Sequence, residues 1–167
     1  MLIRGWVHKI SDFLNRIVRS VLFLTTLSFA GLIFTGVVFR YVIKHPLIFS
    51  VEIAKLLFIW SAFLAVTVAY KEKKHIRFQF LNAFLKEHLL ALNELIIRIS
   101  GCFFFIILLF YAVRFTQAVW PTFFPVLNLS QGWLYVSVIV ALVLLIVHSV
   151  DLSLEALEAL KAGKKHL

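Results

Sequence analysis

The stretch Ser50–Arg77, with the sequence SVEIAKLLFIWSAFLAVTVAYKEKKHIR, decides how this chain folds. Its uncharged part, residues 56–70, would form a helix of only about 22 Å, shorter than the roughly 30 Å core of a lipid bilayer. A helix that crosses a bilayer here must therefore begin before Glu52. This places Glu52 and Lys55, which share a helix face, at one membrane boundary. A basic cluster closes the stretch: Lys71, Lys73, Lys74, His75 and Arg77.

The composition is that of a membrane protein. Hydrophobic residues make up 62% of the 167 residues, and only 15% are charged. Soluble domains are roughly half apolar, and so few charges could not cover so much apolar surface. Apolar runs of membrane-spanning length recur along the chain, which argues against a soluble helical domain and predicts an all-α integral membrane protein.

The positive charge also has a membrane explanation. The formal net charge is +9, but the basic residues flank apolar runs and do not gather in one solvated patch. This pattern follows the positive-inside rule and favours contact with anionic lipid headgroups, so we expect membrane lipids and no nucleic acid as partners. The single cysteine, Cys102, lies in an apolar run and permits neither an internal disulfide nor a cysteine-based metal site.

We predict a single membrane domain with four transmembrane helices. Long apolar runs mark the spans, and apolar residues at three- and four-residue spacing mark two amphipathic segments that we expect in the headgroup layer. The predicted segments over residues 1–167 are an interfacial helix at 1–17, span one at 18–43, span two at 47–70, an interfacial connection at 76–91, span three at 92–119, span four at 130–151 and a cytoplasmic tail at 152–167.

The distribution of lysine and arginine predicts the orientation. These residues are frequent in the N-terminal segment, the middle connection and the tail, whereas the first connection has only Arg40 and Lys44 and the last has none. Four spans with both termini in the cytoplasm put every basic segment on one side, as the positive-inside rule requires. The last connection, Trp120–Gly132, contains two prolines and several aromatic residues and predicts a compact loop at the interface.

Charges near the membrane boundaries form two groups in this topology. Arg40, Glu52, Lys55 and Arg114 fall at the outer level; Arg19, Arg98 and Asp151 fall at the inner level. Charged groups at membrane depth are costly and usually find partners, so we expect Glu52 to pair with Arg114 or Arg40. Two alternatives remain: each charge extends to the headgroups independently, or Glu52 relays protons.

No motif of an enzyme is present. The chain has no glycine-rich phosphate loop, no HExxH sequence and no paired carboxylates in a polar segment. Only His148 of the six histidines lies in a span, near its end, which argues against a haem anchor, and no cofactor is predicted. The span centres carry few polar groups and no internal repeat, so a complete transport pathway within this chain is not favoured. A scaffold for a larger assembly fits better.

Three sets of residues resemble the small permease subunit of tripartite (TRAP) transporters, the DctQ-like family. The first is an Arg-Tyr pair near the end of span one, followed by a proline and a glutamate. The second follows that glutamate through span two, and the third opens span four; Ala65 departs from the glycine that often follows Phe-Leu in the family. The matching residues are Arg40-Tyr41, Pro46 and Glu52; Trp60, Phe63-Leu64, Ala69 and His75-Ile76; and Pro125 with Trp133-Leu134-Tyr135.

The resemblance implies a role as well as a fold. It implies a bacterial or archaeal plasma (inner) membrane protein that braces a larger permease subunit, which holds the transport domain and the sodium sites. It also implies an extracytoplasmic binding protein that delivers an organic acid, such as a C4-dicarboxylate or a sialic acid, for sodium-driven uptake. None of the residues singled out would be catalytic; the structural or interface candidates are Arg40, Glu52, Lys55, Trp60, His75, Arg98, Arg114 and Trp133.

Two other functions compete with this one. A stand-alone four-helix ion-coupled transporter would need an essential carboxylate in the membrane and would act alone. A membrane anchor for a redox or signalling enzyme would need cofactor ligands or a docking motif, and the sequence shows neither. Glu52 lies near the end of its predicted span, which argues against the stand-alone transporter.

Overall fold

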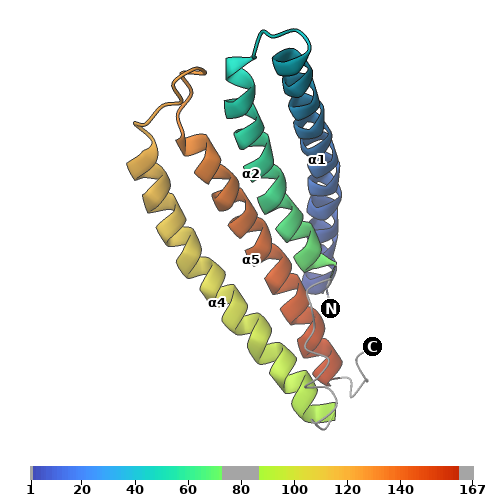
Figure 1. Ribbon diagram of the computed structural model, residues 1–167. Coiled ribbons are helices and arrows are strands. Elements are labelled where there is room, and N and C mark those ends of the chain that lie inside the picture. The colour runs from blue at the N-terminus through green and yellow to red at the C-terminus, as the bar shows by residue number, and fades with distance from the viewer. Residues whose placement is uncertain (1, 73–86, 162–167) are drawn as a thin grey trace.

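The computed structural model describes residues 2–72 and 87–161 (Figure 1). These residues form four helices: α1 (Leu2–Tyr41), α2 (Ile48–Lys71), α4 (Glu87–Val119) and α5 (Gly132–Lys161). Each is long and apolar enough to cross a membrane. The described residues form no strand beyond an isolated bridge between Phe123 and Ser130. The predicted all-α class with four membrane-spanning helices is confirmed.

The helices form an open row in the order α4, α5, α2, α1 (Figure 1). The last helix of the chain, α5, is therefore central: 44% of its most apolar window is buried, against 22% in α2 and none in α1 or α4. Val18, Leu64 and Leu144 form the core where α1, α2 and α5 meet. Aromatic side chains pack between α4 and α5: the ring centroids of Phe115 of α4 and Tyr135 of α5 are 4.8 Å apart.

The connection between α1 and α2 is short because the backbone turns within it. Lys44 has a φ of 60°, and the amide of His45 donates to the carbonyl of Phe39 at 3.0 Å, which satisfies one of the open carbonyls at the end of α1. The Ser50 hydroxyl donates to the carbonyl of Leu47 at 2.6 Å in the first turn of α2. Helices α1 and α2 are thus antiparallel neighbours.

Helix α1 is one unbroken helix of 40 residues. The predicted interfacial segment 1–17 and span one therefore share a single axis of about 60 Å. Their expected placement in the headgroup layer and the bilayer core stays a prediction. Residues 73–86, with most of the interfacial segment predicted at 76–91 and the candidate His75, lie outside the described residues. The first residue of α1 and the last of α5 lie at the same end of the row (Figure 1).

Candidate functional site

The connection between α4 and α5 folds back on itself at the end of the helices opposite to the start of α1 (Figure 1). The amide of Gln131 donates to the carbonyl of Thr122 at 2.8 Å, and the amide of Phe124 donates to the carbonyl of Leu129 at 2.9 Å. Asn128 supplies the turn with a φ of 52°, a conformation that asparagine adopts more readily than most residues. The predicted compact loop is confirmed, and it is held by hydrogen bonds within the connection.

Glu52 binds this loop with both carboxylate oxygens. Its Oε1 accepts from the amide of Val126 at 3.1 Å and its Oε2 from the amide of Leu127 at 2.8 Å. The predicted ion pair with Arg114 or Arg40 is therefore wrong. The loop presents two adjacent amides that have no backbone acceptor, and a carboxylate satisfies both with charge-assisted hydrogen bonds.

The two arginines interact with aromatic rings of their own helices. The guanidinium of Arg114 lies 4.8 Å from the ring centroid of Phe110. That of Arg40 lies 5.7 Å from the ring centroid of Tyr41. Both arginines are exposed and lie outside the group around Glu52.

Three further candidates gather around the loop. The Trp60 indole donates to the carbonyl of Trp133 at 3.0 Å, and the Trp133 ring lies 6.2 Å from that of Trp120. The ammonium group of Lys55 is 6.0 Å from the ring centroid of Phe124. Residues of α2 therefore hold both the loop and the start of α5. We call this group, Glu52, Lys55, Trp60, Trp120, Phe124 and Trp133, the outer clasp.

A second polar group joins α1, α2 and α5 at the opposite end of the helices, where α1 begins and α5 ends. Lys71 Nζ lies 2.5 Å from Asp151 Oδ2 and 3.0 Å from Asp12 Oδ1. The imidazole of His8 lies between the same two carboxylates, 3.2 Å from Asp12 and 3.3 Å from Asp151. Below it the Ser11 hydroxyl is 2.9 Å from Nδ1 of the fully buried His148. We call these six residues, His8, Ser11, Asp12, Lys71, His148 and Asp151, the inner clasp.

Arg98 joins α4 to α5 near the inner clasp. Its guanidinium donates to the carbonyl of Leu152, and its own carbonyl accepts from the Ser149 hydroxyl at 3.2 Å. Next to the inner clasp, Arg19 of α1 forms an ion pair with Glu72. Arg98 and Asp151, which the topology placed at the same level, thus lie on adjoining parts of one polar layer.

Sequence reasoning missed the inner clasp as a unit. Asp12 and His8 belong to the polar side of the amphipathic segment, and that side was expected to face solvent and headgroups. A signal was present: His8, Ser11, Asn15 and Val18 follow one another at spacings of three and four, so one face of the helix passes from polar to apolar. Such a face indicates a polar contact that continues into a packed core.

His8, Asp12 and Asp151 lie close enough to hold a metal ion, with ligand atoms within 4.8 Å of one another. The Lys71 ammonium already contacts both carboxylates and supplies the positive charge between them. Lys71 is only 10% exposed and Asp151 4% by side chain, so this is a desolvated pair whose carboxylates are neutralised inside the protein. The arrangement is a fastener between helices.

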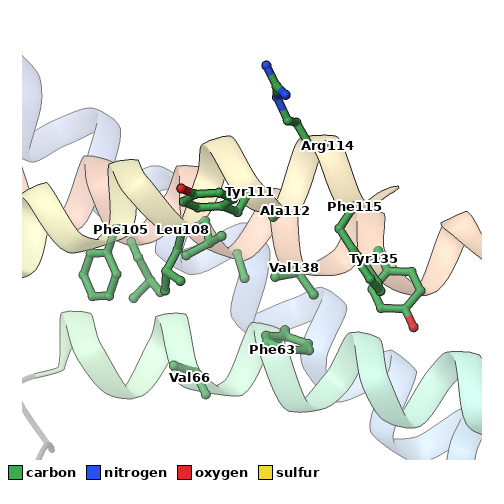
Figure 2. A pocket seen from close by; sticks show the side chains of 13 residues that line it. Phe63, Val66, Phe105, Leu108, Tyr111, Ala112, Arg114, Phe115, Tyr135 and Val138 are labelled. Atoms are coloured by element: carbon green, nitrogen blue, oxygen red, sulfur yellow. The ribbon is translucent and has the colours of Figure 1, made fainter. Parts of the chain in front are cut away.

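An apolar groove lies between α2 and α4, with α5 as its floor (Figure 2). Its volume is about 750 Å³, and its walls are almost wholly carbon, with Phe63 and Val66 on one side and Leu108 on the other. The rings of Tyr70 of α2 and Phe105 of α4 lie 5.7 Å apart between centroids. The Arg114 side chain projects away from the groove (Figure 2). The groove suits apolar side chains or lipid tails and offers no set of groups for binding a polar substrate.

Comparison with known proteins agrees with this architecture. The family described as "Tripartite ATP-independent periplasmic transporters, DctQ component" matches residues 29–159, from the last third of α1 to the last turns of α5. The sialic acid TRAP transporter permease protein SiaT of Haemophilus influenzae (strain 86-028NP) is 22% identical over 141 residues. The alignment covers 84% of this chain but 22% of that permease, so the chain corresponds to a minor part of the length of its relative.

Proposed function

The chain belongs to the DctQ family of TRAP transporter components, and on this premise we propose that it is the small membrane subunit that braces a large permease subunit. The match over residues 29–159 is the observation that carries the proposal. It includes part of α1, all of α2 and α4, nearly all of α5, and the connections α1–α2 and α4–α5. The large subunit would correspond to the part of the longer relative that this chain does not cover.

The contacts of the described residues support a bracing role. The outer clasp joins α2 to the loop and to α5, and the inner clasp joins α1, α2 and α5. Neighbouring helices are therefore fastened to one another near both of their ends. In secondary transporters, alternating access is largely the rigid-body rocking of one repeat or bundle against another. A row fixed at both ends acts instead as a static support, while α1 and α4 retain apolar faces for a partner and for lipid.

We place the transport chemistry in the proposed partners. An extracytoplasmic binding protein would deliver an organic acid, and the large subunit would hold the substrate and sodium sites and move the substrate inward. The name of the relative, a sialic acid permease, makes sialic acid the first substrate to try. The location would be the bacterial inner membrane, with both termini in the cytoplasm, as the basic segments predict.

Reconstitution tests the proposal. The tagged chain, co-expressed with a candidate large TRAP permease subunit from the same genome, should retain that subunit through purification in a mild detergent. Proteoliposomes with both subunits and the binding protein should accumulate radiolabelled sialic acid, or a C4-dicarboxylate, only under an inward sodium gradient. Liposomes that lack this chain are the control and should show no uptake. Uptake by this chain alone, or full uptake without it, would contradict the proposal.

A further inference from the structure

One face of α1 has no partner among the described residues. Trp6, Ile10, Phe13 and Ile17 are 71%, 51%, 63% and 45% exposed and follow one another at spacings of four and three. Side chains that repeat every 3.5 residues form a slowly winding stripe along a helix and mark the seam between two helices that coil lengthwise around each other. The alternation continues into the span, and we call the complete set the α1 seam: Trp6, Ile10, Phe13, Ile17, Ser20, Leu24, Leu27, Gly31 and Phe34.

The α1 seam cannot turn inward, because the opposite face of α1 is already fastened. Asp12 forms its ion pair with Lys71, and Val18 packs in the core with residues of α2 and α5. Near the outer end, a Cβ atom on Gly36 would lie 3.5 Å from the Ser50 hydroxyl of α2. Gly31, in contrast, has open space where its Cβ would be. The two glycines thus face opposite ways, and only Gly31 belongs to the free face.

The reach of the α1 seam favours a helix as its occupant. From Trp6 to Phe34 it extends about 42 Å, which exceeds the roughly 30 Å that lipid tails cover. Between residues 5 and 20 the outward positions beside it are polar, so the apolar line there does not follow from overall composition. The exposed apolar residues of α4 from Ile96 onward lie within a span of 24 residues, and lipid tails can cover them.

Size and charge along the α1 seam fit the same occupant. Ser20 and Gly31 are small and exposed, and small residues let a second helix approach closely within a membrane. Lys9 and Arg16 are exposed and lie one residue before Ile10 and Ile17, at the flanking positions where paired helices form ion pairs. No anion among the described residues contacts either of them. Acidic side chains on a second helix would complement both.

We propose that a long α-helix of the large permease subunit packs lengthwise on the α1 seam, with acidic residues opposite Lys9 and Arg16. This inference rests on the proposed function, because it takes that subunit as the partner. The helix would continue the row beyond α1, opposite the end at which α4 lies (Figure 1).

Photo-crosslinking tests the contact in the assembled complex. Phe13→p-benzoylphenylalanine, irradiated in membranes that contain the tagged large subunit, should yield a covalent product of the two subunits. Val18→p-benzoylphenylalanine is the control and should yield no such product, since Val18 is 7% exposed and packs within the row. Products of Phe13→p-benzoylphenylalanine with lipid alone, or with a second copy of this chain alone, would overturn the inference.

A pair of matched glycine variants tests the close approach. Gly31 and Gly101 are both in helices with open space beside them, one in the α1 seam and one in α4. Gly31→Leu should lower the amount of large subunit that copurifies by at least about tenfold, because the new side chain separates the helices. Gly101→Leu should leave the yield unchanged.

The outcomes separate this inference from the proposed function. If the wild-type chain retains the large subunit but Gly31→Leu does so equally well, or Gly101→Leu is the variant that loses it, the inference is wrong and the bracing role stands. If the wild-type chain does not retain the large subunit at all, both fail together. Circular dichroism of each purified variant checks that the helices are intact.

Discussion

At the scale of single residues, Glu52 shows what an acidic side chain at a helix start can do for a neighbouring loop. The loop amides of Val126 and Leu127 point toward α2 and bind its two carboxylate oxygens. A carboxylate accepts hydrogen bonds without needing a cation, so the sequence rule that pairs acids with bases gave the wrong partner here.

Glu52→Gln should destabilise the protein by about 1–2 kcal/mol, because the amide keeps one acceptor and turns a donor toward the second loop amide. Thermal unfolding in detergent, followed by tryptophan fluorescence, measures the change. Arg114→Gln is the control and should have little effect. If Arg114→Gln costs as much as Glu52→Gln and the double variant costs no more than either, the rejected ion pair would exist after all.

Lys71→Met should be the more damaging single change, at about 3 kcal/mol, because it leaves the buried carboxylate of Asp151 without a counter-ion. Adding Asp151→Asn should restore part of the loss, since the uncompensated charge is then removed. Denaturant titration of the purified variants measures both effects. Lys9→Met, at an exposed position of α1 near the inner clasp, should leave the stability unchanged. An equal loss of stability in Lys9→Met would show that net charge alone matters.

At the scale of elements, the start of α5 depends on a glycine. A Cβ atom at Gly132 would collide with the ring of Trp120, and the Gly132 amide donates to the Ser130 hydroxyl at 3.0 Å. The tryptophan of the loop therefore lies directly against the helix backbone. A position without a side chain permits this contact and fixes where α5 begins.

Gly132→Ala should destabilise the loop by about 1–3 kcal/mol, because the Trp120 ring must move out of the outer clasp. Near-ultraviolet circular dichroism of the tryptophans should weaken while the far-ultraviolet signal stays the same. Gly101→Ala is the matched control in a helix with free space, and it should stabilise by up to about 1 kcal/mol. Unchanged tryptophan signals in Gly132→Ala would contradict the described packing.

The sequence predicts the helices far better than it predicts their contacts. Charge-free runs and flanking arginines locate the four long helices, because a bilayer imposes length and apolarity on each one. The partners of Asp12, Lys71 and His8 depend on which helices become neighbours, and the order α4, α5, α2, α1 leaves no trace in hydropathy. Of the candidates, Trp60 and Trp133 were singled out through the family resemblance, whereas His148 was considered only as a haem ligand and set aside.

At the scale of the whole molecule, the start of α1 and the end of α5 lie on one side, and the loop at Trp120–Gly132 lies on the other (Figure 1). The positive-inside rule predicts that the side with the start of α1 and the end of α5 is cytoplasmic, since the N-terminal segment and the tail are basic. The two clasps would then lie near opposite faces of the membrane, one at each interface.

Cysteine labelling tests this orientation. In a Cys102→Ala background, Leu129→Cys should react with an impermeant maleimide added to intact spheroplasts, because the positive-inside rule predicts that the loop lies outside. Gly5→Cys and Leu157→Cys should react only after lysis. Reaction of Gly5→Cys and Leu157→Cys from opposite sides of the membrane would refute the topology, and reaction of both from outside would invert it.

The central position of α5 has a consequence for biogenesis. A ribosome delivers this helix to the membrane last, yet α4 has its main packing contacts with it and α2 shares a long contact with it. Until residues 132–161 have been inserted, α4 must wait in the bilayer without its main packing partner. A premature stop before Gly132 would therefore strand a helix without its neighbour, a state that membrane quality-control proteases recognise, and such fragments should be degraded rather than accumulate.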